Sequence, residues 1–292
     1  MMADFTITGF ADEIGPDLDE QIRVLHENGI SHIEVRGIDG ENVSEFTLAE
    51  AKGYKKRLDD AGIKVSSIGS PIGKIEITDA FEPHLEQFKH VLEVARVFNA
   101  QYVRVFSFFM ADSDTAKYQD EVIRRWQAFM EAAKDYPEIT LLHENEKAIF
   151  GDVPERCLTL LKSIDSPQLR AAFDPANFVQ CGVKVYPEAF DLLAPYIAYI
   201  HIKDAHYADR AVTPAGYGDG KLKDILARLV KDNYHGYLSL EPHLTEFTGF
   251  AQLEQDGVSI ADNEVDDGAR AFTVASNALK AILVDQLHQE WK

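Results

Sequence analysis

The chain has 292 residues, which is long for an average single domain and close to the size of one α/β barrel. Apolar residues make up 46% and charged residues 27%, a composition typical of folded globular proteins that excludes wholesale disorder. Asp and Glu number 49 against 29 Lys and Arg, so the formal net charge is −20. Because nucleic acids and anionic membranes would repel such a chain, we expect neither as a partner.

The sequence also indicates where the protein works. No apolar run approaches the roughly 18 residues that a membrane span needs. The N-terminal segment MMADFTITGF lacks the basic flank and long apolar core of a signal peptide. Two cysteines, Cys157 and Cys181, are too few for a disulfide framework. We therefore expect a cytoplasmic protein with reduced thiols.

Short β-like runs alternate with longer amphipathic stretches along the chain. The first run, residues 5–11, precedes a stretch in which Leu18, Ile22 and Leu25 recur at helical spacing until Gly29 ends it. The later β-like runs are SHIEVRG, IKVSSIGS, QYVRVFSFF, ITLLHENE, QLRAAFD, YIAYIHIKD and GYLSLEPH. Helices are predicted after them, among others at 115–134, from Pro154 onward, near 187–193 and at about 267–287.

Eight such alternations with no break in composition predict a parallel sheet closed into a single (β/α)8 TIM barrel. No linker rich in Pro, Gly or Ser divides the chain, so residues 1–292 are interpreted as one domain. A doubly wound open sheet is the structural alternative, but no GxGxxG follows the first strand. The extended connection near 245–266 lacks clear periodicity, and connections of that length are usually functional or ordered by a partner.

Four potential metal ligands stand at the ends of the last four predicted strands. They are Glu144, Asp174, His201 and Glu241, and the separations of 30, 27 and 40 residues each approximate one strand–helix unit. In a barrel the chemistry lies at the carboxyl ends of the strands, so these side chains should converge. Three carboxylates and one imidazole suit one divalent metal ion, either Mn²⁺, Mg²⁺, Co²⁺ or Zn²⁺.

Each residue also has a simpler interpretation. Asp174 could cap a following helix, His201 could be a core histidine within an apolar run, and Glu241 could face solvent. The alternation of side chains favours the metal site, because Ile200 and Ile202 share one face of their strand while His201 lies on the other. One shared metal site explains why all four residues lie at inward positions of the strand ends, whereas the simpler interpretations would require four independent coincidences.

The strand-end residues lie in the motifs FDPANF, HIKDA followed by AGYGDG, and LSLEPH. With these motifs the chain resembles the xylose isomerase-like TIM-barrel superfamily, and within it the sugar phosphate isomerases and epimerases. The resemblance implies that Glu144, Asp174, His201 and Glu241 hold one divalent ion and that the two Glu form the acid/base pair. Many ketose epimerases carry a His three residues after the Asp, where this chain has Asn177. That difference argues against a ketose 3-epimerase specifically and against the related three-zinc endonucleases, which need a His there.

This chemistry also follows from general principles. A divalent ion on a carbonyl and its neighbouring hydroxyl stabilises the enediolate that forms when the intervening C–H loses its proton. Return of the proton to the other face of that carbon is an epimerisation, and return to the adjacent carbon is an isomerisation. Glu144 and Glu241 come from strands separated by two others, so they can flank a substrate. The predicted function is therefore a metal-dependent isomerase or epimerase of a sugar or sugar phosphate.

Two alternatives remain from the sequence. A sugar or inosose dehydratase would use the same ion and bases to expel a hydroxyl group, and it would need an acid placed for the leaving group. A non-catalytic sugar-binding barrel would bind its ligand without metal. Whether the chain forms a homo-oligomer is left open.

Further residues are candidates for contact with a small-molecule sugar. Asn177, Lys203, Arg36 and His206 are the predicted substrate-binding residues. Lys203 shares the inward face of His201, Arg36 lies near the carboxyl end of the second strand, and His206 lies just beyond the seventh. Internal ion pairs are expected instead for Glu34 and Arg104, whereas Glu13 could contact substrate and His206 and His243 could line the barrel mouth. His143 should point toward the helices, and the glycine-rich loop at 215–220 is a turn or, less plausibly, a phosphate cradle.

Overall fold

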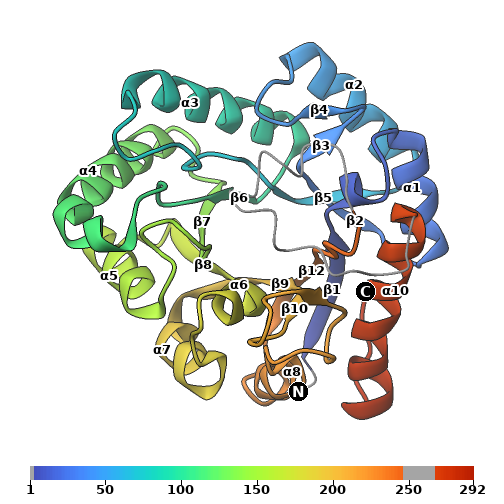
Figure 1. Cartoon of the computed structure of the whole chain (residues 1–292). Coiled ribbons are helices and arrows are strands. Elements are labelled where there is room, and N and C mark those ends of the chain that lie inside the picture. The colour runs from blue at the N-terminus through green and yellow to red at the C-terminus, as the bar shows by residue number, and fades with distance from the viewer. Residues whose placement is uncertain (1–2, 246–266) are drawn as a thin grey trace.

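The computed structural model describes residues 3–245 and 267–292, in which helices surround a central ring of strands (Figure 1). Within these ranges eight parallel strands form the ring: β1 (Asp4–Gly9), β2 (His32–Val35), β5 (Lys64–Ile68), β6 (Tyr102–Val105), β7 (Thr140–Glu144), β8 (Leu169–Phe173), β9 (Ile197–Ile202) and β12 (His235–Leu240). Their order around the ring is β1-β12-β9-β8-β7-β6-β5-β2, and a parallel bridge between Phe10 and Glu34 joins its two ends. The (β/α)8 barrel predicted from the sequence is confirmed.

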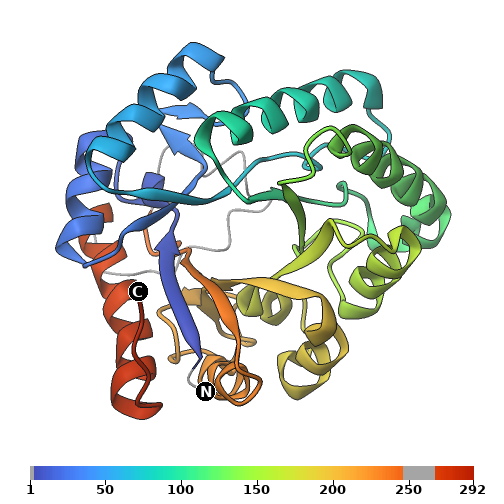
Figure 2. The same cartoon turned by 180° about the vertical axis from the view of Figure 1, so that it is seen from behind.

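Helices cover the outside of the ring, as both views show (Figures 1 and 2). They are α1 (Leu18–Glu27), α2 (Leu48–Asp60), α3 (Phe81–Phe98), α4 (Thr115–Ala133), α5 (Pro154–Ile164), α6 (Pro175–Gln180), α7 (Phe190–Leu193), α8 (Leu222–Lys231) and α10 (Gly268–Lys280). Local signals begin them. Thr47 and Glu50 form a reciprocal capping box at the start of α2, and Asp17 accepts a hydrogen bond from the Glu20 amide at the start of α1.

Two apolar layers hold the barrel together. The larger lies between the strands and the surrounding helices. The smaller fills the lower part of the barrel and consists of Leu142, Ala172 and Tyr199 with Tyr102, Ala198 and Tyr237 packed against them. Because side chains alternate along a strand, the next inward positions after Leu142, Ala172 and Tyr199 are residues 144, 174 and 201. The apolar floor therefore places polar groups directly above it.

The structure refines several predicted boundaries. The helix expected near 187–193 is a π-helical turn at Val185–Ala189 followed by α7, and α6 directly after β8 was not predicted. The C-terminal helix expected at 267–287 is α10, capped by Asp267 and continued by a π-helical segment, Ala281–Gln286. Except for Thr245, the connection near 245–266 lies outside the described residues.

Two small hairpins at the carboxyl side of the barrel were also not predicted. They are β3 (Gly37–Ile38) with β4 (Glu41–Asn42), and β10 (Asp204–Ala205) with β11 (Val212–Thr213). Strands of two residues carry too little periodicity to be recognised in a sequence. In the part of the chain that the structure describes, no helix combines the length and the apolar character that crossing a bilayer requires.

Candidate active site

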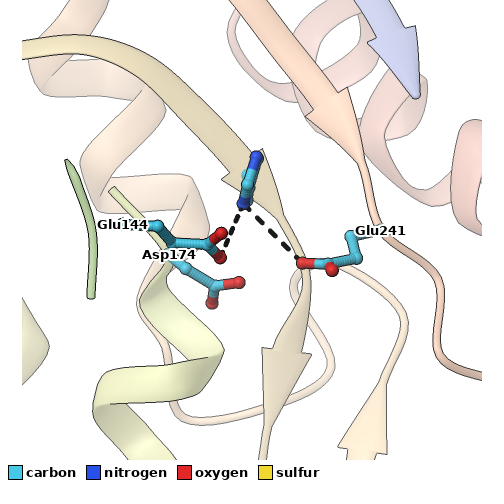
Figure 3. Close-up of side chains that lie close together, drawn as sticks. Glu144, Asp174 and Glu241 are labelled. Atoms are coloured by element: carbon cyan, nitrogen blue, oxygen red, sulfur yellow. Dashed lines mark hydrogen bonds and ion pairs between the residues drawn. The ribbon is translucent and has the colours of Figure 1, made fainter. Parts of the chain in front are cut away.

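Four buried side chains meet at the carboxyl end of the barrel. Glu144 ends β7, Asp174 directly follows β8, His201 lies near the end of β9 and Glu241 directly follows β12, and these strands are neighbours in the ring. None is more than 3% exposed, and each offers a ligand atom within 4.8 Å of those of the others. Figure 3 shows the three carboxylates turned toward one another. We call these four residues the carboxylate–histidine cluster.

His201 is held in one orientation by carboxylates on both sides of its ring. Nδ1 lies 2.9 Å from Glu144 Oε1 and 3.7 Å from Glu241 Oε2, whereas Nε2 lies 3.4 Å from Glu34 Oε2. Burial disfavours the charged imidazole, but Glu144 and Glu34 outweigh it and raise the pKa of His201 well above its usual value. A carboxylate behind one ring nitrogen, here Glu34 behind Nε2, is typical of histidine metal ligands, and the other nitrogen, Nδ1, faces the carboxylates of the cluster.

The two carboxylate oxygens of Asp174 do different things. Oδ1 accepts a hydrogen bond of 2.9 Å from the Asn177 amide and so caps α6, while Oδ2 lies 3.1 Å from Lys203 Nζ. The capping interpretation and the ligand interpretation therefore apply to different atoms of one side chain. Burial raises the pKa of Asp174 to about 7. Lys203 opposes this shift, and the nearby Glu241 and Glu144 add to it.

The charge balance of the cluster fits a divalent cation. Five buried carboxyl groups form ion pairs with Arg36, Arg104 and Lys203, namely Asp12, Glu13, Glu144, Asp174 and Glu241, and a sixth, that of Glu34, contacts His201. Glu144 Oε2 and Asp174 Oδ2 are buried and accept no well-formed hydrogen bond, and their polar contacts are the ion pairs with Arg104 and Lys203. An excess of negative charge in a poorly solvated site is unfavourable, and a divalent ion on the oxygen atoms and Nδ1 would offset it. The residues present therefore fit one such ion.

Three of the four predicted substrate-binding residues contact the cluster. Lys203 Nζ bridges Asp174 and Glu241 at 3.1 and 3.0 Å, and Arg36 Nη1 lies 3.3 Å from Glu241 Oε1. Asn177 Nδ2 donates to Glu144 Oε1 at 3.3 Å. All three side chains therefore contact residues that are proposed to bind the metal ion.

His206 lies elsewhere. Its side chain is 42% exposed, and Nδ1 lies 3.9 Å from Asp219 Oδ2, because the β10–β11 hairpin carries it away from the strand end. His143 points toward the helices as predicted, with its ring 5.6 Å from that of Trp126 in α4 and Nε2 3.0 Å from Ser107 Oγ.

Arg104 belongs to the site to a greater degree than the sequence indicated. Its Nη1 lies 3.2 Å from Glu144 Oε2 and 3.9 Å from Glu241 Oε1, so one guanidinium contacts both predicted acid/base residues. Glu34, for which an ion pair was also expected, contacts His201 and accepts a hydrogen bond of 2.6 Å from Ser239 Oγ. Strand alternation placed both residues inward, but it could not show which partners they would meet.

A second group, the Arg36 cluster, adjoins Glu241 on the side of β1 and β2. It consists of Asp12, Glu13, Arg36 and His243. Arg36 Nε lies 2.7 Å from Asp12 Oδ2 and Nη2 3.0 Å from Glu13 Oε1, while His243 Nε2 lies 3.4 Å from Glu13 Oε1 and 3.5 Å from Glu241 Oε1. Burial raises the pKa of Glu13 to about 8 against the effect of Arg36. Burial, with Lys203 nearby, lowers the pKa of His243 well below its usual value.

The chain belongs to the xylose isomerase-like TIM-barrel family, whose sequence profile matches residues 22–263. No curated protein matches it by sequence. Among solved structures, D-psicose 3-epimerase crystallised in the presence of D-fructose is similar with a TM-score of 0.71 at 16% identity, covering 98% of this chain and 100% of the other. The zinc-binding IOLI protein gives 0.71 at 13%, covering 96% and 98%. The probable 3-DHS dehydratase AsbF from Bacillus anthracis gives 0.65 at 16%, covering 94% and 98%. Similarity at these identities shows the shared fold.

Proposed function

We propose that the chain is a divalent-metal-dependent isomerase or epimerase that moves a proton on a sugar. The observation that carries the proposal is the convergence of Glu144, Asp174, His201 and Glu241, whose ligand atoms lie within 4.8 Å of one another at the carboxyl ends of four neighbouring strands. The fold shared with D-psicose 3-epimerase and with a zinc-binding protein supports the same conclusion.

The residues have distinct proposed roles. A bound divalent ion would polarise a substrate carbonyl and the adjacent hydroxyl and so lower the energy of the enediolate. Glu144 and Glu241 lie on strands that β8 and β9 separate, so they reach a substrate from two sides and serve as base and acid. Proton transfer by such groups contributes about 10²–10⁴-fold to the rate. Arg104, in contact with both, holds the two carboxylates in place.

Dehydration of a sugar or inosose is the second candidate, and the Arg36 cluster favours it. A dehydratase needs an additional acid beside the base to protonate the departing hydroxyl. Glu13 and His243 lie next to Glu241, with His243 Nε2 3.4 and 3.5 Å from the two carboxylates, and they could supply that acid. Analysis of the products separates the candidates, because dehydration releases water and leaves an unsaturated or deoxy-keto product whereas isomerisation conserves the formula.

Exchange of substrate hydrogen with solvent deuterium tests the proposal. Purified protein loaded with Mn²⁺ is incubated in deuterium oxide with a panel of ketoses, aldoses and inososes, and incorporation is followed by mass spectrometry after removal of the ion. We expect incorporation at the carbon next to the carbonyl, lost on chelation and restored by the metal. Exchange that persists after complete removal of metal would contradict the metal-dependent mechanism, and sugar binding with no exchange would favour the non-catalytic alternative.

A further inference from the structure

The glycine-rich loop, which could have served as a phosphate cradle, is occupied by a side chain of the protein itself. The amides of Gly216, Gly218 and Gly220 donate to the carboxylate of Asp204 at 3.0, 3.0 and 2.8 Å. A Cβ at Gly218 would lie 2.4 Å from Asp204 Oδ1, so glycine is required there for the loop to wrap this closely. These amide donors are therefore engaged with an internal anion, in the way that other loops bind phosphate.

The buried cations at this end of the barrel are likewise engaged with internal carboxylates. Four such side chains, each at most 4% exposed, occur among the described residues of the site: Arg36, Lys74, Arg104 and Lys203. Lys74, on the loop after β5, pairs at 3.1 Å with Glu146 on the loop after β7. The other three neutralise members of the two clusters described above. Arg104 also donates to the backbone oxygen of Gly69 at 3.1 Å.

The balance of charge points the same way. Arg36, Arg104 and Lys203 each contact at least two carboxyl groups of the site, so none of these three cations is left over to receive an anion. The sequence of residues 246–266 adds no cation. Their sequence contains six carboxylates and no Lys, Arg or His.

We infer that the substrate is an uncharged sugar and that sugar phosphates and sugar acids are excluded from the site. The inference rests on the proposed function and names its substrate class. A phosphate or carboxylate group entering the site would lose its hydration and meet carboxyl groups whose buried cations, like the loop amides, are already engaged. A neutral polyol instead offers hydroxyl groups that can donate to carboxylates and accept from Lys203 or Asn177.

Matched pairs of compounds test the inference. The metal-loaded protein is titrated calorimetrically with xylitol and with xylitol 5-phosphate, and deuterium exchange is measured for free ketoses beside the phosphate esters of the same ketoses. We expect the uncharged member to be preferred by at least about 100-fold in affinity or in exchange rate. The preference should shrink as salt is added, since screening weakens the repulsion of the phosphate.

A pair of variants provides the control. Glu146→Gln removes the carboxylate that neutralises Lys74, so this variant should bind xylitol 5-phosphate more tightly than the wild type, by about tenfold. The double variant Glu146→Gln/Lys74→Met should lose that gain.

The outcomes separate the two proposals. Equal or better binding or exchange of the phosphorylated member overturns the inference and leaves the isomerase proposal intact. If no sugar exchanges but xylitol is still preferred over its phosphate, the proposed function fails while the exclusion of charged ligands is supported. Binding of neither polyol, with no exchange of any sugar, overturns both.

Discussion

The carboxylate–histidine cluster and the Arg36 cluster contain similar residue types, meet at Glu241 and are almost completely buried, but they hold different cations. In the Arg36 cluster the guanidinium contacts three carboxylates and lies 4.4 Å from the centre of the Phe10 ring. In the other cluster the ammonium of Lys203, on a flexible stem, contacts Asp174 and Glu241. A planar guanidinium in a fixed fork is suited to permanent support, whereas a lysine can move aside. We therefore interpret the Arg36 cluster as a frame for Glu241 and the carboxylate–histidine cluster as the place for an exchangeable ion.

The largest effect should come from the two acid/base residues. Glu144→Gln and Glu241→Gln keep an oxygen atom for the metal but cannot accept a proton, so kcat should fall by about 10³-fold in each. Steady-state kinetics and deuterium exchange from each of the two interconverting sugars would measure it. Each variant should retain exchange from one of the two sugars only. Glu138→Gln, at the exposed ion pair with Arg96, is the matched control, and turnover near the wild-type level in either catalytic variant would remove that Glu from the mechanism.

The next effect concerns Glu34, which contacts His201 on the side away from the cluster. Glu34→Gln weakens the orientation of the imidazole, and loss of such an outer partner typically costs about 10–100-fold in metal affinity. His201→Ala should lower the affinity further while the barrel stays folded. Mn²⁺ titration followed by electron paramagnetic resonance measures both, with thermal unfolding of the metal-free proteins as the control. A collapse of metal-free stability in His201→Ala would instead identify a core histidine.

Metal binding should strengthen as the pH rises. Because the pKa of His201 is raised well above its usual value, its imidazole is protonated in the metal-free protein at neutral pH, and Asp174, with a pKa of about 7, is partly protonated. A ligand must lose its proton, so affinity should increase by at least about tenfold for each pH unit between pH 6 and 7, His201 giving up one proton and Asp174 part of another. Calorimetry in buffers of different ionisation enthalpy should detect proton release. An affinity that does not change over this range would contradict the assignment of His201 as a ligand.

The smallest effect distinguishes the cations of the two clusters. Lys203→Met removes a positive charge beside Asp174 and Glu241, so metal affinity should rise by roughly fivefold while the metal-free protein loses stability. Addition of Mn²⁺ should restore the lost stability.

Arg36→Lys should lower kcat but leave the metal affinity within about twofold, because the Arg36 guanidinium contacts Glu241 from the other cluster. Equal effects of both variants on metal affinity would remove the distinction between the clusters.

The sequence was sufficient to predict the convergence of Glu144, Asp174, His201 and Glu241. Strand alternation and the parallel order of the strands together determine which side chains meet at the carboxyl edge. The Arg36 cluster could not be predicted in the same way. It depends on the pairing of β1 with β12, which brings residues 12–13 beside residues 241–243, and on how far a guanidinium reaches across the ring.

Two further features depended on loops. His206 follows a strand closely in the sequence, yet the unpredicted β10–β11 hairpin leaves it half exposed. The loop at 215–220 has the glycines of an anion-binding turn, but only the structure identifies Asp204 as the anion that it holds. The exposure of His206 and the partner of the loop both depend on contacts between separate segments, and the local periodicity of a sequence does not encode such contacts.

The most direct test of the central claim is a crystal structure of the protein soaked in Mn²⁺, with an anomalous difference map recorded at a wavelength where manganese scatters strongly. The account predicts a single strong peak within coordination distance, about 2.0–2.3 Å, of Glu144, Asp174, His201 Nδ1 and Glu241. It also predicts that Lys203 Nζ lies farther from Asp174 than the 3.1 Å of the present structure. A peak between Glu13, Glu241 and His243, or no peak at the four strand ends, would contradict it.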